Sequence, residues 1–490
     1  MKQRFLCSLI ALTIAVAGYA STREITLAEA VAMARRQSVD AAVALNELRS
    51  AYWEYRTFKA DLLPEISFSA TAPSYNTRYS SYQKDDGSYT FLRDDNLMVN
   101  GALTLEQRIW LTGGTISLTS SLDFMRQLSG DVGNRFMSVP VALKLNQPIF
   151  GVNDVKWKRK IEPYKYRAAK AAYISATEEV AMTAIQYFFN LLSARENESS
   201  ALQNVENARR LYDVAKAKRE MGKISENDLL QIELNLLNSQ STLTDYQSTV
   251  KSCMFRLRSF LDIDADVELI PVVPEKSRDV EVAFDNAFGH ALENNTFYLD
   301  IMRRYHESEY AVAQAKAKQR EINLFAQVGY TGVADRAGYA YRGLKDNRIV
   351  EVGISIPLVD WGKRRGQVKV AQSNHQLTVN RIKKEREDFR QDLFVLVERF
   401  NNQQQQLALA SRADEIAVRR YDSSVETFMV GKISALDLND AQDNKDTARA
   451  KYFNELFYYW YYYYKLRSIT LWDYENDSPI EVDFENILKN

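Results

Sequence analysis

The octapeptide Gly-Lys-Ile-Ser-Glu-Asn-Asp-Leu (Gly222–Leu229) recurs as Gly-Lys-Ile-Ser-Ala-Leu-Asp-Leu (Gly431–Leu438), and this repeat decides the fold. A Tyr-Asp pair precedes each copy by ten residues, at Tyr212 and at Tyr421. The offset between the two copies is 431 − 222 = 209 residues. Self-similarity at a fixed offset is typical of a repeat architecture, so the sequence predicts two copies of one structural plan.

Two further segments, Gln147-Pro148-Ile149 and Ile356-Pro357-Leu358, stand at the same offset, which extends the repeat over about 80 residues. Apolar residues alternate with polar or small ones ahead of both prolines, in residues 139–146 and 350–356. A period of two is typical of strands with one apolar face. Comparable alternation in residues 66–70, 324–330, 99–109 and 116–124 brings the predicted strands to six.

The predicted strands 99–109 and 116–124 are joined by Leu111-Thr112-Gly113-Gly114, a glycine-rich turn suited to a hairpin. This hairpin has no counterpart in the second copy. Phe68 and Phe325 give an offset of 257 ahead of it, so the first copy holds 257 − 209 = 48 extra residues. That length suffices for two strands and a turn. The sequence leaves open whether the extra hairpin adds two strands to the other four or packs outside them.

Long helical stretches precede each octapeptide. Residues 154–221 and 362–430 contain no Gly or Pro apart from Pro163 near the start of the first stretch and Gly362 and Gly366 at the start of the second. At a rise of ~1.5 Å per residue, each stretch makes a helix about 100 Å long, whereas an average helix has about three turns. After Gly222, apolar residues recur every seven positions as in a coiled-coil seam, at Leu229, Leu236, Leu243, Val250 and Leu257.

The net charge, the N-terminal segment and the cysteine content limit the classes of protein that fit this sequence. With 63 basic and 64 acidic residues the formal net charge is −1, which does not favour a nucleic-acid partner. The first twenty residues read as a signal peptide, with Lys2 and Arg4 ahead of an apolar run over 5–16. Removal of this signal peptide takes Cys7 with it and leaves Cys253, so no intramolecular disulfide is expected. The predicted strands fit the roughly 9 to 11 residues of a membrane-crossing strand.

A closed membrane barrel needs at least about eight strands, so several chains would have to share one. The order of the motifs resembles the TolC-like outer membrane efflux family: an opening helix at Ile25–Ala30, Leu63-Pro64 before the first strand, strands ending at Gln-Pro-Ile-Phe and Ile-Pro-Leu-Val, and the duplicated octapeptide. The resemblance covers about Ile25 to Trp472. It implies a mainly α fold with transmembrane β, in which duplicated long antiparallel coiled-coil helices accompany β-strands of a shared trimeric outer-membrane β-barrel. Members of the family usually contribute four strands per chain.

The resemblance also implies a function. The chain is expected to be the outer-membrane channel-tunnel of a tripartite efflux or type I secretion system, a passive conduit with no enzymatic activity and no cofactor or metal. Its expected partners are two further copies in a homotrimer, a periplasmic adaptor protein, an inner-membrane pump and outer-membrane lipid, but no nucleic acid. The helical barrel is expected to lie in the periplasm.

Candidate functional residues follow from matching the family motifs onto this sequence. Asp437 and Asp440 match the spacing of the family's acidic pore gate, and Asp443 follows three residues later. Two such carboxylates share one face of a helix, although a solvated helix N-terminus also favours carboxylates. The resemblance places the tips of the helical hairpins, with the expected adaptor contacts, at Gly222, Lys223, Ser225, Asp228, Gly431, Lys432 and Ser434.

The predicted division of the chain is a signal peptide (1–20), a first repeat (21–275), a second repeat (276–472) and a C-terminal tail (473–490). The aromatic run Phe457–Tyr464 is interpreted as a helix-packing segment, with a membrane belt as the less favoured reading. The three histidines are scattered and suggest no metal site. A periplasmic coiled-coil scaffold without a transmembrane pore remains the alternative function, and a monomeric porin or barrel enzyme a weaker third.

Overall fold

The computed structural model describes residues 22–128, 133–275, 280–319, 322–354, 360–430 and 432–489. The predicted signal peptide, the segment 356–358 and Gly431 lie outside these residues. Elements up to residue 271 are β1 (Thr22–Ile25), α1 (Leu27–Gln37), α2 (Val39–Ala60), β2 (Glu65–Gln83), β3 (Tyr89–Arg108), β4 (Thr115–Gln127), β5 (Gly133–Pro148), α3 (Asp154–Glu220), α4 (Glu226–Leu261) and β6 (Glu268–Pro271). They are followed by α5 (Phe284–Asn294), α6 (Thr296–Ala317), β7 (Ile322–Ala334), α7 (Ala337–Ala340), β8 (Lys345–Ile354), α8 (Lys363–Met429), α9 (Ala435–Thr470), β9 (Trp472–Asp473), β10 (Ser478–Pro479) and α10 (Phe484–Lys489).

The helices repeat with the offsets that the sequence gives. Helices α3 and α8 each have 67 residues and start 363 − 154 = 209 residues apart, and α4 and α9 each have 36 residues and start 435 − 226 = 209 apart. Ahead of the extra strands, α2 and α6 each have 22 residues and start 296 − 39 = 257 apart. The predicted duplicated architecture is therefore confirmed. Within the described ranges, no helix is both long enough and apolar enough to cross a membrane.

Two compact units divide the chain, and both draw on both copies of the repeat. Unit 1 contains the described residues of Met1–Glu47, Ala171–Asn295 and Arg390–Phe484, and unit 2 those of Leu48–Lys170, Thr296–Phe389 and Glu485–Asn490. Helices α3 and α8 run through both units because each crosses a unit boundary. Unit 2 holds the large sheet, and unit 1 holds both helical hairpin ends.

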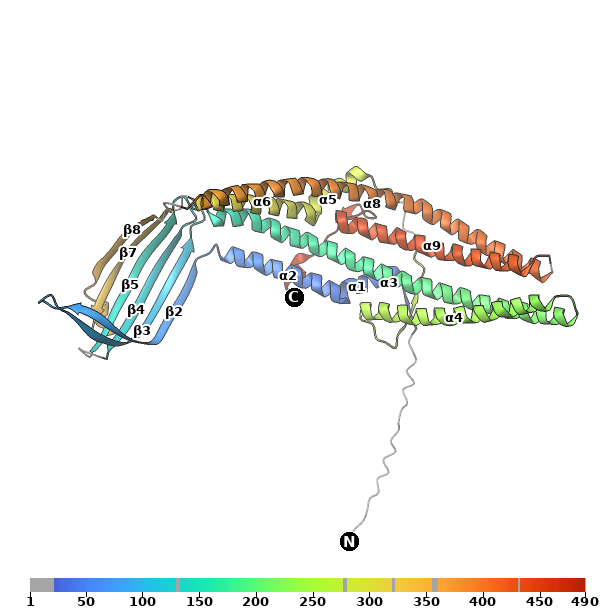
Figure 1. Cartoon of the computed structure of the whole chain (residues 1–490), viewed down its shortest axis with the longest axis horizontal. Helices are drawn as coiled ribbons and strands as arrows, with labels where there is room; N and C mark the ends of the chain where they lie inside the picture. The colour runs from blue at the N-terminus through green and yellow to red at the C-terminus, as the bar shows by residue number, and fades with distance from the viewer. Residues whose placement is uncertain are drawn as a thin grey trace, which may run out of the picture. The chain divides into compact units, whose positions relative to one another are not determined.

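The sheet of unit 2 has six antiparallel strands in the order β2-β3-β4-β5-β7-β8 (Figure 1). Strands β3 and β4 form the extra hairpin, so it joins the sheet between β2 and β5. Their turn requires Gly113 at φ +79°, in the left-handed region that favours glycine. It closes through hydrogen bonds from Ile109 N to Gly114 O (2.7 Å) and from Gly113 N to Ile109 O (2.8 Å).

Packing in unit 1 centres on a buried ionic cluster around Glu178 of α3, which is 1% exposed. The Glu178 carboxylate accepts hydrogen bonds from Arg35 of α1 (2.6 Å) and from Arg467 Nε of α9 (3.1 Å). Arg467 also pairs with Asp473 at 2.7 Å. Burial alone would lower the pKa of Arg467, but Glu178, Tyr463 and Asp473 outweigh it and raise that pKa. The cluster thus joins α1, α3, α9 and β9 by charge-assisted bonds.

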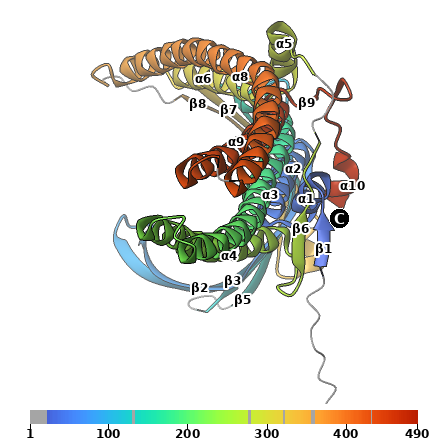
Figure 2. The ribbon, with the colours of Figure 1, turned by 90° about the vertical axis from the view of Figure 1, so that its right-hand side faces the viewer.

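Two further features of unit 1 are the short strand pair β1–β6 and the packing of the aromatic run. Strands β1 and β6 pair in parallel, Ile25 opposite Pro271, and lie side by side near α1 (Figure 2). Within the aromatic run of α9, Tyr459 and Tyr463 are buried, and Phe457 packs edge-on against Phe189 of α3 at 5.8 Å. These contacts agree with the helix-packing interpretation.

Candidate functional site

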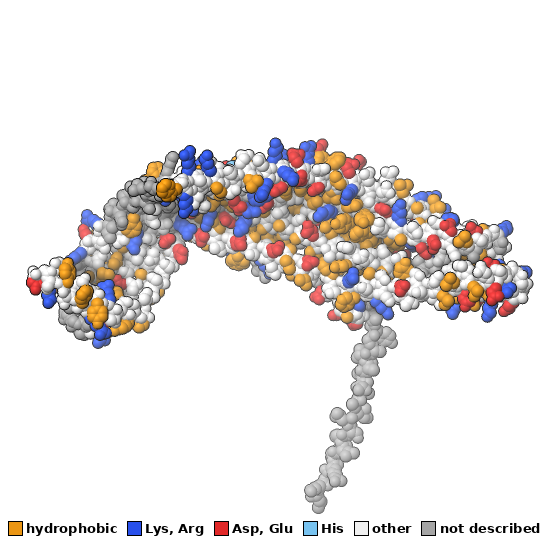
Figure 3. All heavy atoms as spheres, viewed as in Figure 1, with side chains coloured by type: hydrophobic (Ala, Val, Ile, Leu, Met, Phe, Trp, Pro, Cys, Tyr) orange, Lys and Arg blue, Asp and Glu red, His pale blue; other side chains and the backbone are white. Residues whose placement is uncertain are grey.

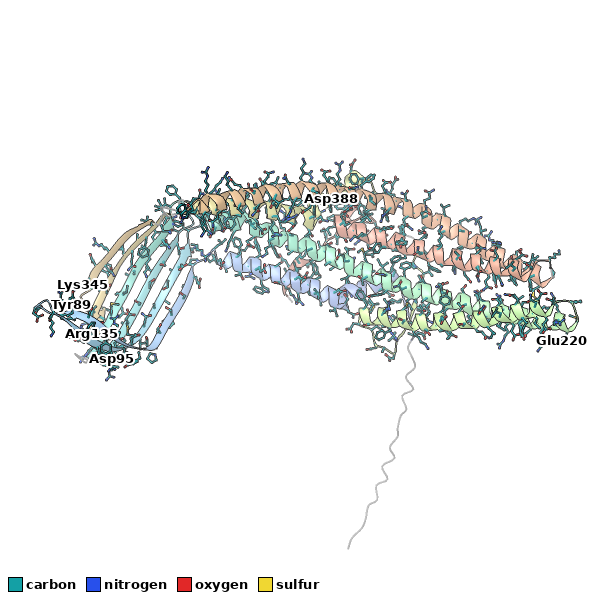
Figure 4. All side chains as sticks on the ribbon, in the orientation of Figure 1. Tyr89, Asp95, Arg135, Glu220, Lys345 and Asp388 are labelled. Carbon is teal, nitrogen blue, oxygen red and sulfur yellow. The ribbon has the colours of Figure 1, made fainter. Side chains whose placement is uncertain are left out.

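The turn between α3 and α4 is built by its own residues. Gly222 adopts φ +68°, and Lys223 N donates to Lys218 O at 2.9 Å, which closes the end of α3. Ser225 then caps α4: its Oγ accepts from Asp228 N at 3.1 Å, while Asp228 Oδ2 accepts from Ser225 N at 3.1 Å. This reciprocal capping box satisfies donors that a helix N-terminus leaves open. Figure 4 marks the start of the turn at Glu220.

The described residues of the turn between α8 and α9 repeat these hydrogen bonds. Lys432 N donates to Thr427 O at 3.1 Å, the counterpart of the Lys223 bond. Ser434 caps α9, with Asp437 N donating to Ser434 Oγ at 3.2 Å and Ser434 N donating to Asp437 Oδ2 at 3.0 Å. Lys223 and Lys432 are both exposed. Figure 3 shows acidic and basic side chains mixed over the ends of the helical hairpins in that view.

The aspartate three residues after each cap serine, Asp228 or Asp437, is hydrogen-bonded to that serine. Hydrogen bonds from the side chain and then the backbone of Ser225 lower the pKa of Asp228, and Ser434 lowers the pKa of Asp437 in the same way. Both carboxylates are fully exposed and therefore charged at neutral pH. Asp437 thus has a structural task in addition to any effect on ions.

Asp440, the second predicted gate residue, has a partner that sequence reasoning missed. Its Oδ2 lies 2.6 Å from Arg420 Nη2 of α8, and both side chains are more than half exposed. The positions 209 residues earlier hold Leu211 and Gln231, so the pair exists in the second copy alone. Asp443 is exposed as well.

The second turn also places an apolar residue, Ile433, against the neighbouring helices. Ile433 packs against a buried cluster of Tyr421, Leu438 and Ala441. The basic side chain that contacts Asp440 is Arg420, one residue before the Tyr421 that marks the repeat. That adjacency to a repeated residue is the signal that could have found it.

A polar cluster one to two turns beyond Asp437 and Asp440 was not predicted from the sequence. Lys445 of α9 is buried, lies 4.3 Å from the centre of the Tyr421 ring and donates to Asn204 Oδ1 at 3.3 Å. Asp446 accepts from Ser200 Oγ at 2.7 Å and from Asn204 Nδ2 at 2.9 Å. The cluster borders a cavity of about 420 Å³ between α3, α8 and α9. The position corresponding to Lys445 in the first copy is Leu236, a coiled-coil seam residue, and that exchange in the repeat could have signalled the cluster.

Comparison with known proteins places this geometry in context. A family model described as outer membrane efflux protein matches residues 30–261 and 304–455. The fold is similar to the CmeC outer membrane channel of Campylobacter jejuni, at 16% identity and a TM-score of 0.66 over 94% of this chain and 88% of that one. It is similar to the outer membrane protein VceC of Vibrio cholerae, at 14% identity and a TM-score of 0.64 over 93% and 97%. The open state of the MtrE channel of Neisseria gonorrhoeae gives 12% identity and a TM-score of 0.58 over 91% and 88%. No curated protein matches the sequence.

Proposed function

This chain belongs to the outer membrane efflux protein family, and from that premise we propose that it is the outer-membrane channel of a tripartite efflux or type I secretion system. It lies in the outer membrane with its helical part in the periplasm, and it conducts cargo passively instead of catalysing a reaction. The observation that carries this proposal is the six-stranded sheet, whose cross-strand rows alternate between apolar and polar residues over β2, β3, β4, β5 and β7. Such a sheet can present one face to lipid and the other to a water-filled lumen.

The working form is a homotrimer. Six strands are fewer than the eight or so of the smallest membrane barrels, and an open sheet edge in hydrocarbon would leave backbone groups without hydrogen bonds. The edge strands β2 and β8 run antiparallel to their inner neighbours and end the strand order on either side. Pairing of β2 of one chain with β8 of the next satisfies both edges.

The two helical turns contact the periplasmic adaptor and the inner-membrane pump. Their exposed lysines, Lys223 and Lys432, sit at the ends of helices about 100 Å long. Photo-cross-linking amino acids at these positions should capture the adaptor in whole cells. The matched control is Lys251, also exposed but about 40 Å further along α4. Cross-links of equal yield from all three positions would argue against adaptor contact at the turns.

Asp437 and Asp440 act on ions at the narrow end of the conduit. In a trimer they form two stacked rings of carboxylates, which favour cations. Asp437→Asn combined with Asp440→Asn should lower the cation preference measured in planar bilayers. Unchanged selectivity would remove both residues from the gate.

Extraction from the outer-membrane fraction tests the function as a whole. A channel of this kind should require detergent and should migrate on a gel as a heat-labile trimer. Release by salt alone as a monomer would instead fit a periplasmic coiled-coil scaffold.

A further inference from the structure

The extra hairpin occupies an unusual place in the sheet. Four of the six strands connect directly to long or paired helices: β2 follows α2, β5 precedes α3, β7 follows α6, and β8 precedes α8. Strands β3 and β4 connect to no helix, yet they lie between β2 and β5. The first copy thus widens the sheet by two strands without adding a helix.

Cross-strand rows show that the extra strands keep the two-faced pattern of their neighbours. One row is apolar on five strands, where it runs through Ile66, Leu105, Leu118, Leu143 and Val328, and it ends at Arg348 on β8. The rows on either side point to the opposite face of the sheet, because side chains alternate along a strand. These rows are Glu65, Glu106, Ser117, Lys144 and Gln327, and Ser67, Thr104, Thr119, Ala142 and Gly329.

Polar contacts within the hairpin lie on that second face. Thr104 Oγ1 and Thr119 Oγ1 are 3.4 Å apart, and Asn100, four residues away along β3, donates to the Asp123 carboxylate. The hairpin strands have 20 and 13 residues, more than the roughly 9 to 11 that cross a membrane. Figure 4 places Tyr89 of β3 at the same end of the sheet as Arg135 of β5 and Lys345 of β8.

Hydrogen bonds and a cation–π contact connect the turn of the hairpin to β5 and to the start of α3. Thr112 Oγ1 donates to Gln147 Oε1 of β5 at 2.7 Å. Asn153 Nδ2 donates to Trp110 O at 2.9 Å, and the Arg159 guanidinium of α3 lies 5.0 Å from the Trp110 ring centre. Strands β3 and β4 pair with each other without a register shift, and their turn is hydrogen-bonded to the residues around it. The hairpin is therefore an integral part of the sheet.

We propose that β3 and β4 line the export lumen, so that each chain supplies six strands and a trimer closes a wall of eighteen. The proposal rests on the trimeric channel proposed above and adds the composition of its outer end. Barrel diameter grows roughly linearly with strand number, so this exit is about 1.5 times as wide as one built from four strands per chain. Its lumen-facing rows include Thr104 and Thr119, while Leu103 and Leu118 face lipid.

Thiol accessibility in planar bilayers tests this assignment. In a background with Cys7 and Cys253 replaced by serine, single cysteines are placed at Thr104 and Thr119 and treated with the water-soluble cationic reagent MTSET. Each should lose single-channel conductance in up to three steps, one per chain. Leu103→Cys and Leu118→Cys are matched controls on the same strands and should show no steps. Gln327→Cys on β7 is the positive control, because it faces the lumen whether or not the hairpin does.

The outcomes separate the inference from its premise. Steps at Gln327→Cys without steps at Thr104→Cys and Thr119→Cys would overturn the six-strand wall and leave the channel intact. The absence of any conducting channel in the cysteine-free background would defeat the proposed function instead. Should one threonine variant fail to assemble, the other lies on the neighbouring strand and carries the same test.

Discussion

The two helical hairpins, α3–α4 and α8–α9, have the same lengths and the same caps but opposite surfaces near their turns. On α4, Leu230, Leu234 and Leu237 are all more than half exposed. The corresponding positions of α9, 209 residues later, hold Asn439, Asp443 and Asp446. One helix face is thus leucine in the first copy and polar in the second.

The polar contacts of the second copy connect it to the first copy of the same chain. Asn439 accepts from Asn235 Nδ2 at 2.9 Å, and Asp446 accepts from Ser200 and Asn204 of α3. Leu230, Leu234 and Leu237 of α4 are instead exposed on the surface of the single chain, where they form an apolar stripe at helical spacing. The two hairpins therefore share one backbone plan, while their surfaces differ: the polar face is suited to contacts within the chain, and the leucine face to the contacts between chains proposed above.

Exchanging the leucine stripe for its counterpart should have the largest effect. Leu230→Asn with Leu234→Asp and Leu237→Asp puts charges where a neighbouring chain is expected to pack, and each buried leucine contributes about 1.5–3 kcal/mol. We expect the heat-labile trimer to be lost on gels and in gel filtration. Methionine at the same three positions, apolar and of similar size, should retain it. An intact trimer that no longer cross-links to the adaptor would assign the stripe to the adaptor instead.

The next-largest effect is expected at the buried ionic cluster around Glu178. Glu178→Gln leaves Arg35 and Arg467 without their carboxylate, and breaking a buried pair costs about 3–5 kcal/mol. The thermal midpoint of the purified protein should fall by several degrees. The matched control is Glu387→Gln, the equivalent position of the second copy, where the side chain is exposed and the midpoint should barely move. Equal effects at both positions would contradict the structural role of the cluster.

The sequence predicted the parts of this fold that local residues specify. The turn glycines, the serine caps and the strand-ending prolines recur at one offset, and that offset locates α3, α4 and their counterparts. Alternation predicted all six strands, although β3 begins at Tyr89, ten residues before the predicted start, because the polar residues Arg93 and Asp95 interrupt the pattern there.

The contacts between distant residues were not predictable in this way. Glu178 and Arg467 are 289 residues apart, and Lys445 and Asn204 are 241 apart. Periodicity shows that a side chain faces inward but not which charge meets it there. The position of the extra hairpin within the sheet also depended on its pairing with β2 and β5, which strand patterns alone do not fix.

The Arg420–Asp440 pair gives a smaller test, since its stability contribution at the surface is within about 1 kcal/mol. Arg420→Leu introduces the residue type found at the corresponding position of the first copy, Leu211 of α3. It leaves the Asp440 carboxylate without its cation. Cation preference in planar bilayers should rise, opposite to the effect of Asp440→Asn. Arg419→Leu removes the same charge from an exposed neighbour and is the control. A similar rise in both variants would show that total charge matters and the pair does not.

The smallest effect is expected at the caps, where the two copies should behave alike. Ser225→Ala and Ser434→Ala should each speed amide hydrogen exchange in the first turn of the following helix about fivefold, with the other turn unchanged. Because the caps lower the pKa values of Asp228 and Asp437, their stabilisation is present above the unfolded carboxyl pKa and is lost as pH falls through the lower folded value. After correction for intrinsic rates, acidification below about pH 4 should therefore loosen both turns. Asp437→Asn should abolish this acid response in α9 and preserve it in α4; a response that persists in α9 would assign it to another carboxylate.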